Sequence, residues 1–79
     1  MQNHSEQQLL HSLSLLISKK RKDANLSEEQ LAELAQISVH RIKSLEEGKE
    51  RLGLELLSKL AHAFHTTVID LISEAEDFN

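Results

Sequence analysis

The sequence predicts an all-α fold, a bundle of five helices, and three observations favour it. Leucine, isoleucine and alanine recur every three or four residues, which is the period of a helix with one buried face. There is no proline, and glycine occurs only at Gly48 and Gly53, so helices meet few breaks. No segment alternates apolar and polar residues like a half-buried strand. At 79 residues, the chain is expected to form one domain spanning residues 1–79.

The first helix is expected over residues 5–23. Ser5, with Gln8 three positions later, fits a capping box. Apolar residues then follow at helical spacing: Leu9, Leu13, Leu16 and Ile17. The segment ends in KKRKDAN, whose bases suit the negative end of a helix dipole. Asn25 in that stretch tolerates the left-handed conformation in which helices often end.

Two short helices are expected next, over residues 27–35 and 38–47. Ser27 and Gln30 form a second capping box, and Ser38 is a further N-cap. The apolar positions of the two helices are Leu31, Leu34, Ala35, Ile42 and Leu45. Gly48 is expected to end the second of them. Two helices joined by about three residues have the helix-turn-helix arrangement.

The last two helices are expected over residues 54–64 and 67–74. The first of them is indicated by apolar residues at helical spacing, which are Leu54, Leu57, Leu60, Ala61 and Phe64. Thr67 is expected to cap the other, whose apolar residues are Val68, Leu71 and Ile72. The acidic SEAEDFN tail is expected to fray, because chain ends without buried contacts are poorly ordered.

A family resemblance covers about residues 13–72. LSEEQLAELAQISVHRIKSLEEGK, followed by LELLSKLAHAFHTTVIDL, resembles the phage repressor and Cro-like helix-turn-helix family, also called the xenobiotic response element family. The positions in register are Leu26, Ser27, Leu31, Ala32, Ile37, Ser38, Ile42, Leu45, Glu46 and Gly48. The resemblance implies a repressor-like bundle that binds double-stranded DNA sequence-specifically, usually as a symmetric dimer that regulates transcription.

The resemblance also implies which residues face DNA. Four positions of the 38–47 helix fall in base-facing slots: Val39, His40, Lys43 and Ser44. Their chemistry agrees, since a lysine donates to guanine and a valine can touch a thymine methyl. Backbone or flanking positions are Arg21, Lys22, Ser27, Arg41, Lys49 and Arg51. Cations at these positions neutralise phosphates, so affinity is expected to fall with salt.

Four residues depart from the family pattern. Glu28 stands where a phosphate-binding Gln is common, and a carboxylate there repels phosphate. Gln36 and His65 replace glycines at helix ends, so Gln36 must be either strained or not left-handed. Lys20 takes an inward apolar position, where its alkyl stem can lie over the core edge.

The charge is uneven along the chain. The formal net charge is -4, but eight of the nine Lys and Arg residues lie between Lys19 and Arg51. Because local potential governs contact with phosphate, an acidic chain can still bind DNA through one basic face. The expectation is an electropositive ridge along the 38–47 helix and its flanking cations.

A homodimer surface is expected on the last helix, where apolar residues exceed what one core needs. The residues assigned to it are Leu56, Val68, Ile69, Ile72 and Phe78. The two half-sites of a dyad-symmetric operator then have centres about 34 Å apart. The first helix, with Leu9 and Leu10, either joins this surface or packs on the last helix.

Other function classes are weighed against these expectations. The chain has no cysteine, so thiolate chemistry is excluded. The sequence shows no Ser-His-Asp or paired-carboxylate constellation and no glycine-rich phosphate loop, so neither an enzyme nor a cofactor is expected. His62 and His65 are three apart but lack a third metal ligand. No apolar run is long enough for a membrane, and a cytoplasmic protein is expected. The main alternative is a protein-interaction module of the same fold, antitoxin-like or a repressor partner, with weak or no DNA binding.

Overall fold

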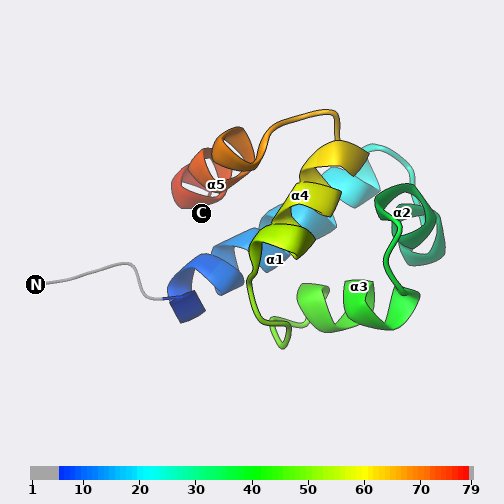
Figure 1. The fold of residues 1–79 in the computed structure, drawn as a ribbon, viewed down its shortest axis with the longest axis horizontal. Helices are drawn as coiled ribbons and strands as arrows, with labels where there is room; N and C mark the ends of the chain where they lie inside the picture. Colours follow the sequence, from blue (N-terminus) through cyan, green and yellow to red (C-terminus); the bar gives the residue numbers. More distant parts are fainter. Residues whose placement is uncertain (1–5, 79) are drawn as a thin grey trace, which may run out of the picture.

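The computed structural model describes residues 6–78, which form five helices and no strand. In chain order they are α1 (Glu6–Asp23), α2 (Glu28–Ala35), α3 (Val39–Glu46), α4 (Leu54–Ala63) and α5 (Val68–Asp77), labelled in Figure 1. The predicted all-α fold class is confirmed. Ser5, expected to cap the first helix, lies outside the described residues.

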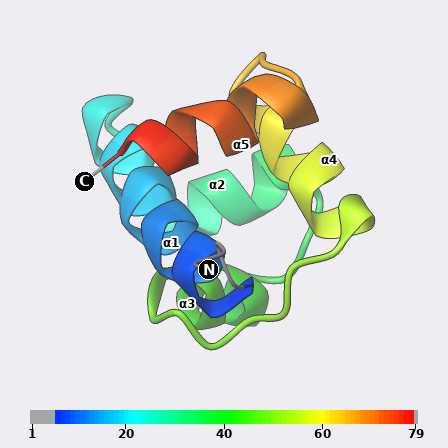
Figure 2. The same ribbon diagram turned by 90° about the vertical axis from the view of Figure 1, so that its left-hand side faces the viewer.

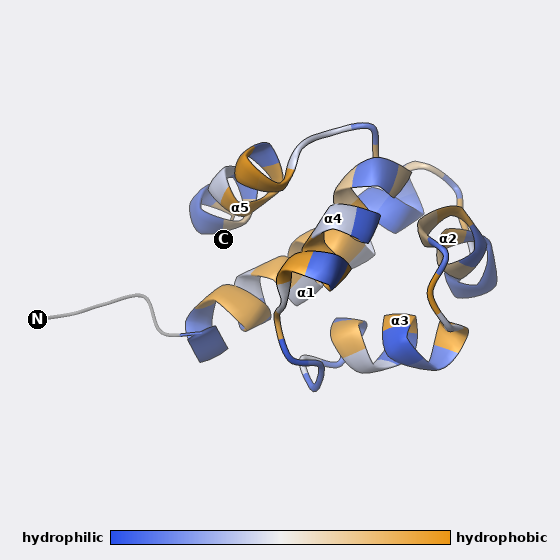
Figure 3. Cartoon of the chain, viewed as in Figure 1, coloured by the Kyte–Doolittle hydropathy of each residue, from blue (hydrophilic) through white to orange (hydrophobic). Residues whose placement is uncertain are grey.

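The helices form a closed ring of neighbours around one core. α1 packs against α5 and α3, α2 packs against α3 and α4, and α4 packs against α5. Figure 2 shows this ring end-on, with α5 across the top and α3 at the bottom. Each helix has hydrophobic and hydrophilic faces, as Figure 3 shows, because it turns one face to the centre of the bundle. No helix within residues 6–78 is both long and apolar enough to cross a membrane.

The core consists of large aliphatic side chains from all five helices. Those with less than 2% exposure are Leu13, Ile17, Leu31, Ile42, Leu45, Leu56, Leu60 and Leu71. The expectation that Leu56 lies on a dimer surface is therefore wrong, because its side chain is 1% exposed. α4 packs against both α2 and α5, so its buried face is wide enough to take in Leu56 as well as Leu57 and Leu60.

The acidic tail is more ordered than its composition suggests. α5 runs to Asp77 rather than ending at residue 74, so the expectation of fraying is wrong for residues 75–77. Ala75 is fully buried, and Glu74 forms an ion pair of 3.2 Å with Lys20 of α1. Phe78 caps the helix and packs on the core edge. These contacts with the rest of the fold hold the last turn, which the sequence alone does not reveal.

Helices α1 to α4 end in the same way. The residues after them, Asn25, Gln36, Gly48 and His65, have φ of 60°, 59°, 75° and 57°. In each case the next backbone N–H donates to a carbonyl five residues back, as from Ile37 to Ala32 at 3.1 Å. Of the two alternatives for Gln36, the strained one is observed. Its backbone is left-handed, a conformation that strains a non-glycine residue.

Lys20 fills its apolar position as expected for a long amphipathic side chain. Its ammonium lies 5.7 Å from the centre of the Phe64 ring and pairs with Glu74. The stem therefore runs along the α1–α5 packing while the charge stays at the edge. Leu9 and Leu10, the other residues of α1 with an open role, pack against the core.

Candidate nucleic-acid interface

The α2–α3 pair is fixed by its caps and by shared apolar residues. The Ser27 hydroxyl accepts from the Gln30 N–H at 3.0 Å, and the Gln30 side chain accepts from the Ser27 N–H at 2.8 Å. Ser38 likewise accepts from the Arg41 N–H at 3.1 Å. Leu31 of α2 is fully buried with Ile42 and Leu45 of α3. Because those faces of α2 and α3 pack against each other, the opposite face of α3 is turned outward.

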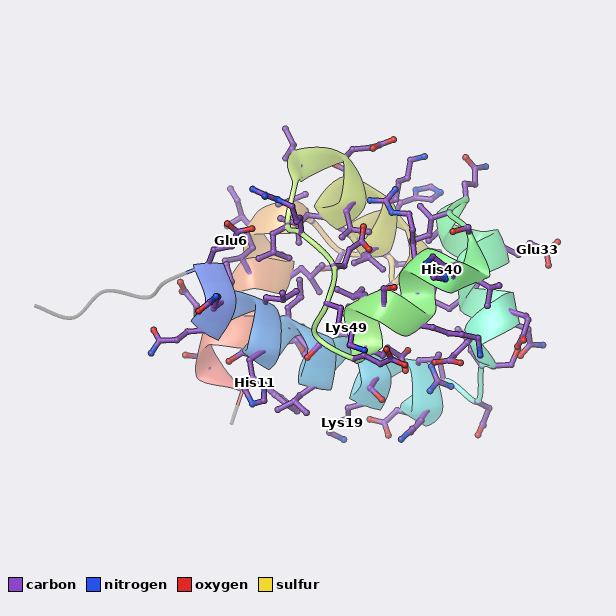
Figure 4. The ribbon with its side chains drawn as sticks, turned by 90° about the horizontal axis from the view of Figure 1, so that it is seen from below. Glu6, His11, Lys19, Glu33, His40 and Lys49 are labelled. Atoms are coloured by element: carbon purple, nitrogen blue, oxygen red, sulfur yellow. The ribbon has the colours of Figure 1, made fainter. Side chains whose placement is uncertain are left out.

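The outward face of α3 carries two of the four base-facing candidates. His40 and Lys43 are exposed, whereas Val39 and Ser44 are half-buried, with Val39 packed on the core. Figure 4 looks onto this side of the molecule, where His40 lies on α3 and Lys49 near its end. The structure brings all four residues onto one short helix of eight residues.

Three cations on or next to α3, namely Arg41, Lys43 and Lys49, have carboxylate partners. Lys43 Nζ lies 2.9 Å from Glu28 Oε1, and Arg41 Nε lies 3.0 Å from Glu50 Oε2. Lys49 pairs more loosely with Glu47, at 3.4 Å. The expectation of an electropositive ridge is therefore wrong for these three cations, because each lies beside a carboxylate. The cause is tertiary, since α2 and the loop after α3 bring Glu28 and Glu50 beside the cations of α3.

Lys22 and Arg51 differ from the other flanking cations. Both are exposed, and within residues 6–78 neither takes part in an ion pair. They lie at the end of α1 and in the loop after α3. Their charges remain available to an anion without any rearrangement.

Arg21 is tied into the fold instead of standing free for a phosphate. Its Nε and Nη2 donate to the two carboxylate oxygens of Glu46 at 2.7 and 3.0 Å, and Nη1 donates to the Leu26 carbonyl at 2.9 Å. The side chains of Arg21 and Glu46 are only 13% and 9% exposed. The hydrogen bond that Arg21 donates to Glu46 raises the pKa of Arg21. This fork joins α1 to the last turn of α3 and so fixes α3 against α1.

The Lys43–Glu28 contact also shifts the pKa of both groups. The hydrogen bond from Lys43 is the main cause that lowers the pKa of Glu28, and the same bond raises the pKa of Lys43. Both groups are thus held in their charged forms around neutral pH. The sequence indicates that Glu28 is an acid at a phosphate-facing position. It does not indicate the partner, because Lys43 lies 15 residues away along the chain.

Two further expectations concern residues away from α3. Ile69 is 80% exposed on α5, while Val68, Ile72 and Phe78 are partly buried against the core. His62 and His65 are exposed, and within residues 6–78 no three side chains of metal-binding type gather.

The chain is similar to known helix-turn-helix proteins in both sequence and structure. A helix-turn-helix family model matches residues 17–71. Two crystal structures of the clp gene regulator ClgR from Corynebacterium glutamicum are similar. One is 29% identical with a TM-score of 0.76 over 87% of this chain and 73% of that chain. The other is 28% identical with a TM-score of 0.77 over 89% and 90%.

A more distant structural relative shares the fold. The wild-type restriction-modification controller protein C.Esp1396I is 19% identical, with a TM-score of 0.77 over 87% of this chain and 91% of that chain. No curated protein matches the sequence.

Proposed function

The chain belongs to the Cro-like helix-turn-helix family, and on that premise we propose that it is a transcriptional regulator that reads DNA with α3. The observation that carries the proposal is the packing of α2 against α3. It buries the inner faces of the two helices and exposes His40 and Lys43 on the outer face of α3. ClgR is a gene regulator and C.Esp1396I a controller protein, so regulation by this fold has precedent among its relatives. A cytoplasmic location goes with this role.

The roles proposed for single residues follow from their exposure. His40 and Lys43 project furthest and suit base edges, where lysine donates to guanine O6 or N7. Val39 and Ser44 are half-buried and suit closer contacts, such as Val39 with a thymine methyl. The residues proposed for the sugar-phosphate backbone are Lys22, Ser27, Arg41, Lys49 and Arg51. Arg21, with its donors on Glu46 and Leu26, is proposed as a positioning residue.

We further propose that the regulator acts as a homodimer through α5. Ile69 is 80% exposed on this helix, which also carries Val68 and Ile72 and ends at Phe78. A large exposed aliphatic side chain favours burial by a second copy. α5 and α3 lie on different sides of the molecule in Figures 1 and 2, so pairing through α5 leaves both recognition helices uncovered. The half-site centres of the operator are then about 34 Å apart.

Selection of bound duplexes from random oligonucleotides tests this proposal. We expect enrichment of a palindrome whose half-sites are about one helical turn apart. His40→Ala and Lys43→Ala should then relax the preference at particular base pairs. Lys59→Ala, on α4, removes the same charge as Lys43→Ala and is the matched control. If no sequence is enriched, even in dilute buffer, the chain is not a DNA reader.

The charge pairing on α3 favours one alternative, a protein-interaction module of the same fold. Lys43, Arg41 and Lys49 all have carboxylate partners, which weakens attraction to phosphate. Such a module, antitoxin-like or a repressor partner, should elute from heparin at a salt concentration that Lys43→Ala and Arg41→Ala leave unchanged. A regulator should instead elute at lower salt when either cation is removed.

A further inference from the structure

We propose that Glu28 masks the recognition helix by holding Lys43 in an ion pair, which DNA must displace before Lys43 can reach a base. The inference rests on the proposed function, because it concerns how the same surface is regulated. It assigns to Glu28 an autoinhibitory role: the residue limits DNA affinity without being a contact to DNA itself.

The geometry of the pair places both groups where DNA is proposed to lie. Glu28 is the first residue of α2, directly after the cap Ser27, and its carboxylate reaches across to α3. Lys43 Nζ approaches it to 2.9 Å, with the Lys43 side chain 51% and the Glu28 side chain 25% exposed. The N-terminus of a helix attracts anions, and phosphate is the anion expected there in a complex. In the free protein the Glu28 carboxylate stands in the first turn of this helix and is bound to Lys43.

A single charged nitrogen makes Lys43 easy to mask. An ammonium that is bound to a carboxylate attracts a second anion less than a free one does, since the net charge of the pair is zero. Arg41 differs, because it pairs with Glu50 through Nε and has two further nitrogens in its guanidinium group. The Glu28–Lys43 pair therefore affects DNA binding more directly than the Arg41–Glu50 pair does.

The pair is also weak enough to open. Ion pairs with solvent access are screened by water and salt, and they exchange partners readily. A guanine edge can therefore draw Lys43 away from Glu28. The carboxylate then remains beside the phosphate backbone without its partner, and the like charges repel each other. Both effects oppose every complex in which α3 enters the groove.

The test compares Glu28→Gln with Glu29→Gln in the full chain. Both substitutions remove one negative charge from the first turn of α2, but only Glu28 is the partner of Lys43. Duplex affinity is measured by fluorescence anisotropy between about 50 and 200 mM salt, with circular dichroism as the check of folding. For Glu28→Gln we expect affinity to rise about tenfold and the slope of log K against log salt to steepen by about one. Glu29→Gln should change affinity by much less.

Lys43→Ala in both backgrounds completes the experiment. If Glu28 masks Lys43, the loss of the lysine costs much more affinity in the Glu28→Gln background than in the unmodified chain. Equal gains from Glu28→Gln and Glu29→Gln, or equal costs of Lys43→Ala in both backgrounds, overturn the mask while leaving the regulator proposal intact. If none of the variants binds any duplex, both proposals are overturned together.

Discussion

Gln36 and His65 show how single residues carry strain in this fold. Both have left-handed φ values near 60° at helix ends, where glycine is the unstrained choice. The N–H of the next residue still donates to the carbonyl five residues back, at 3.1 Å after Gln36 and 2.9 Å after His65. The hydrogen bonds of the helix ends therefore outweigh the local conformational cost.

We expect Gln36→Gly and His65→Gly each to stabilise the chain by about 0.5–1 kcal/mol. Relief of left-handed strain exceeds the entropy that glycine adds to the unfolded chain. Gly48→Ala tests the converse, because φ is 75° and the added Cβ meets nothing closer than Ser14 Oγ at 4.0 Å. Its expected net loss of about 0.5–1 kcal/mol then comes from the backbone, because left-handed strain again exceeds the difference in unfolded-chain entropy. Urea unfolding measures all three, and a destabilised Gln36→Gly variant would contradict the explanation.

The titration of Glu28 gives a second prediction at the residue scale. Because Lys43 lowers the pKa of Glu28 in the folded chain, the pair contributes stability above the ordinary glutamate range. That contribution is lost as the pH falls through the lowered pKa, when Glu28 takes up a proton. Carbon-detected NMR of the carboxyl groups should show Glu28 titrating at lower pH than in a Lys43→Ala variant. An unchanged midpoint would show that the pair does not form in solution.

At the scale of helices, the Arg21–Glu46 fork joins α1 to α3. It is nearly buried, and both guanidinium contacts to Glu46 are short. A charge that loses its partner in such a place costs more than the pair gains, because the remaining group stays desolvated. The position of α3 relative to α1 thus depends on this buried pair.

We expect Arg21→Ala to destabilise the chain by about 2–3 kcal/mol, since Glu46 is left without its partner. Arg51→Ala removes the same charge from an exposed position and should change stability by less than about 0.5 kcal/mol. The double variant Arg21→Met/Glu46→Leu should recover much of the loss. Chemical denaturation gives all three values. Equal effects of Arg21→Ala and Arg51→Ala would show that the fork contributes little.

The helix boundaries follow local signals closely. Ser27, Ser38 and Thr67 were predicted as N-caps, and each accepts a hydrogen bond from the N–H three residues on. A hydroxyl before an apolar helix acts over a single turn, so its effect can be predicted from sequence. The end of α5 could not be predicted in this way, because its last turn depends on contacts of Glu74 and Ala75 with the rest of the fold.

For the whole molecule, the distribution of surfaces matters more than the net charge of -4. α3 presents the proposed DNA face with its paired charges, and α5 presents the exposed Ile69 on another side. The two surfaces serve separate tasks in the proposed regulator, so each can be altered without direct damage to the other.

We expect Ile69→Asp to keep the chain folded but to abolish the dimer and lower operator affinity. The side chain is 80% exposed, so the substitution removes little from the core. Leu54→Asp, at a position 71% exposed on α4, is the matched apolar-to-acid control and should leave the dimer intact. Sedimentation equilibrium distinguishes the two variants. A dimer that survives Ile69→Asp would place the interface elsewhere.

The sequence by itself determined the all-α class, the N-caps and the family, because helical periodicity and capping act between residues a few positions apart. Only the tertiary structure decided that Leu56 is core, that Arg21 joins Glu46, and that Glu28 neutralises Lys43. Arg21 and Glu46 are 25 residues apart along the chain, and Glu28 and Lys43 are 15 residues apart. Whether a charge is paired or a leucine is covered depends on which helix packs against which, and no local pattern encodes that.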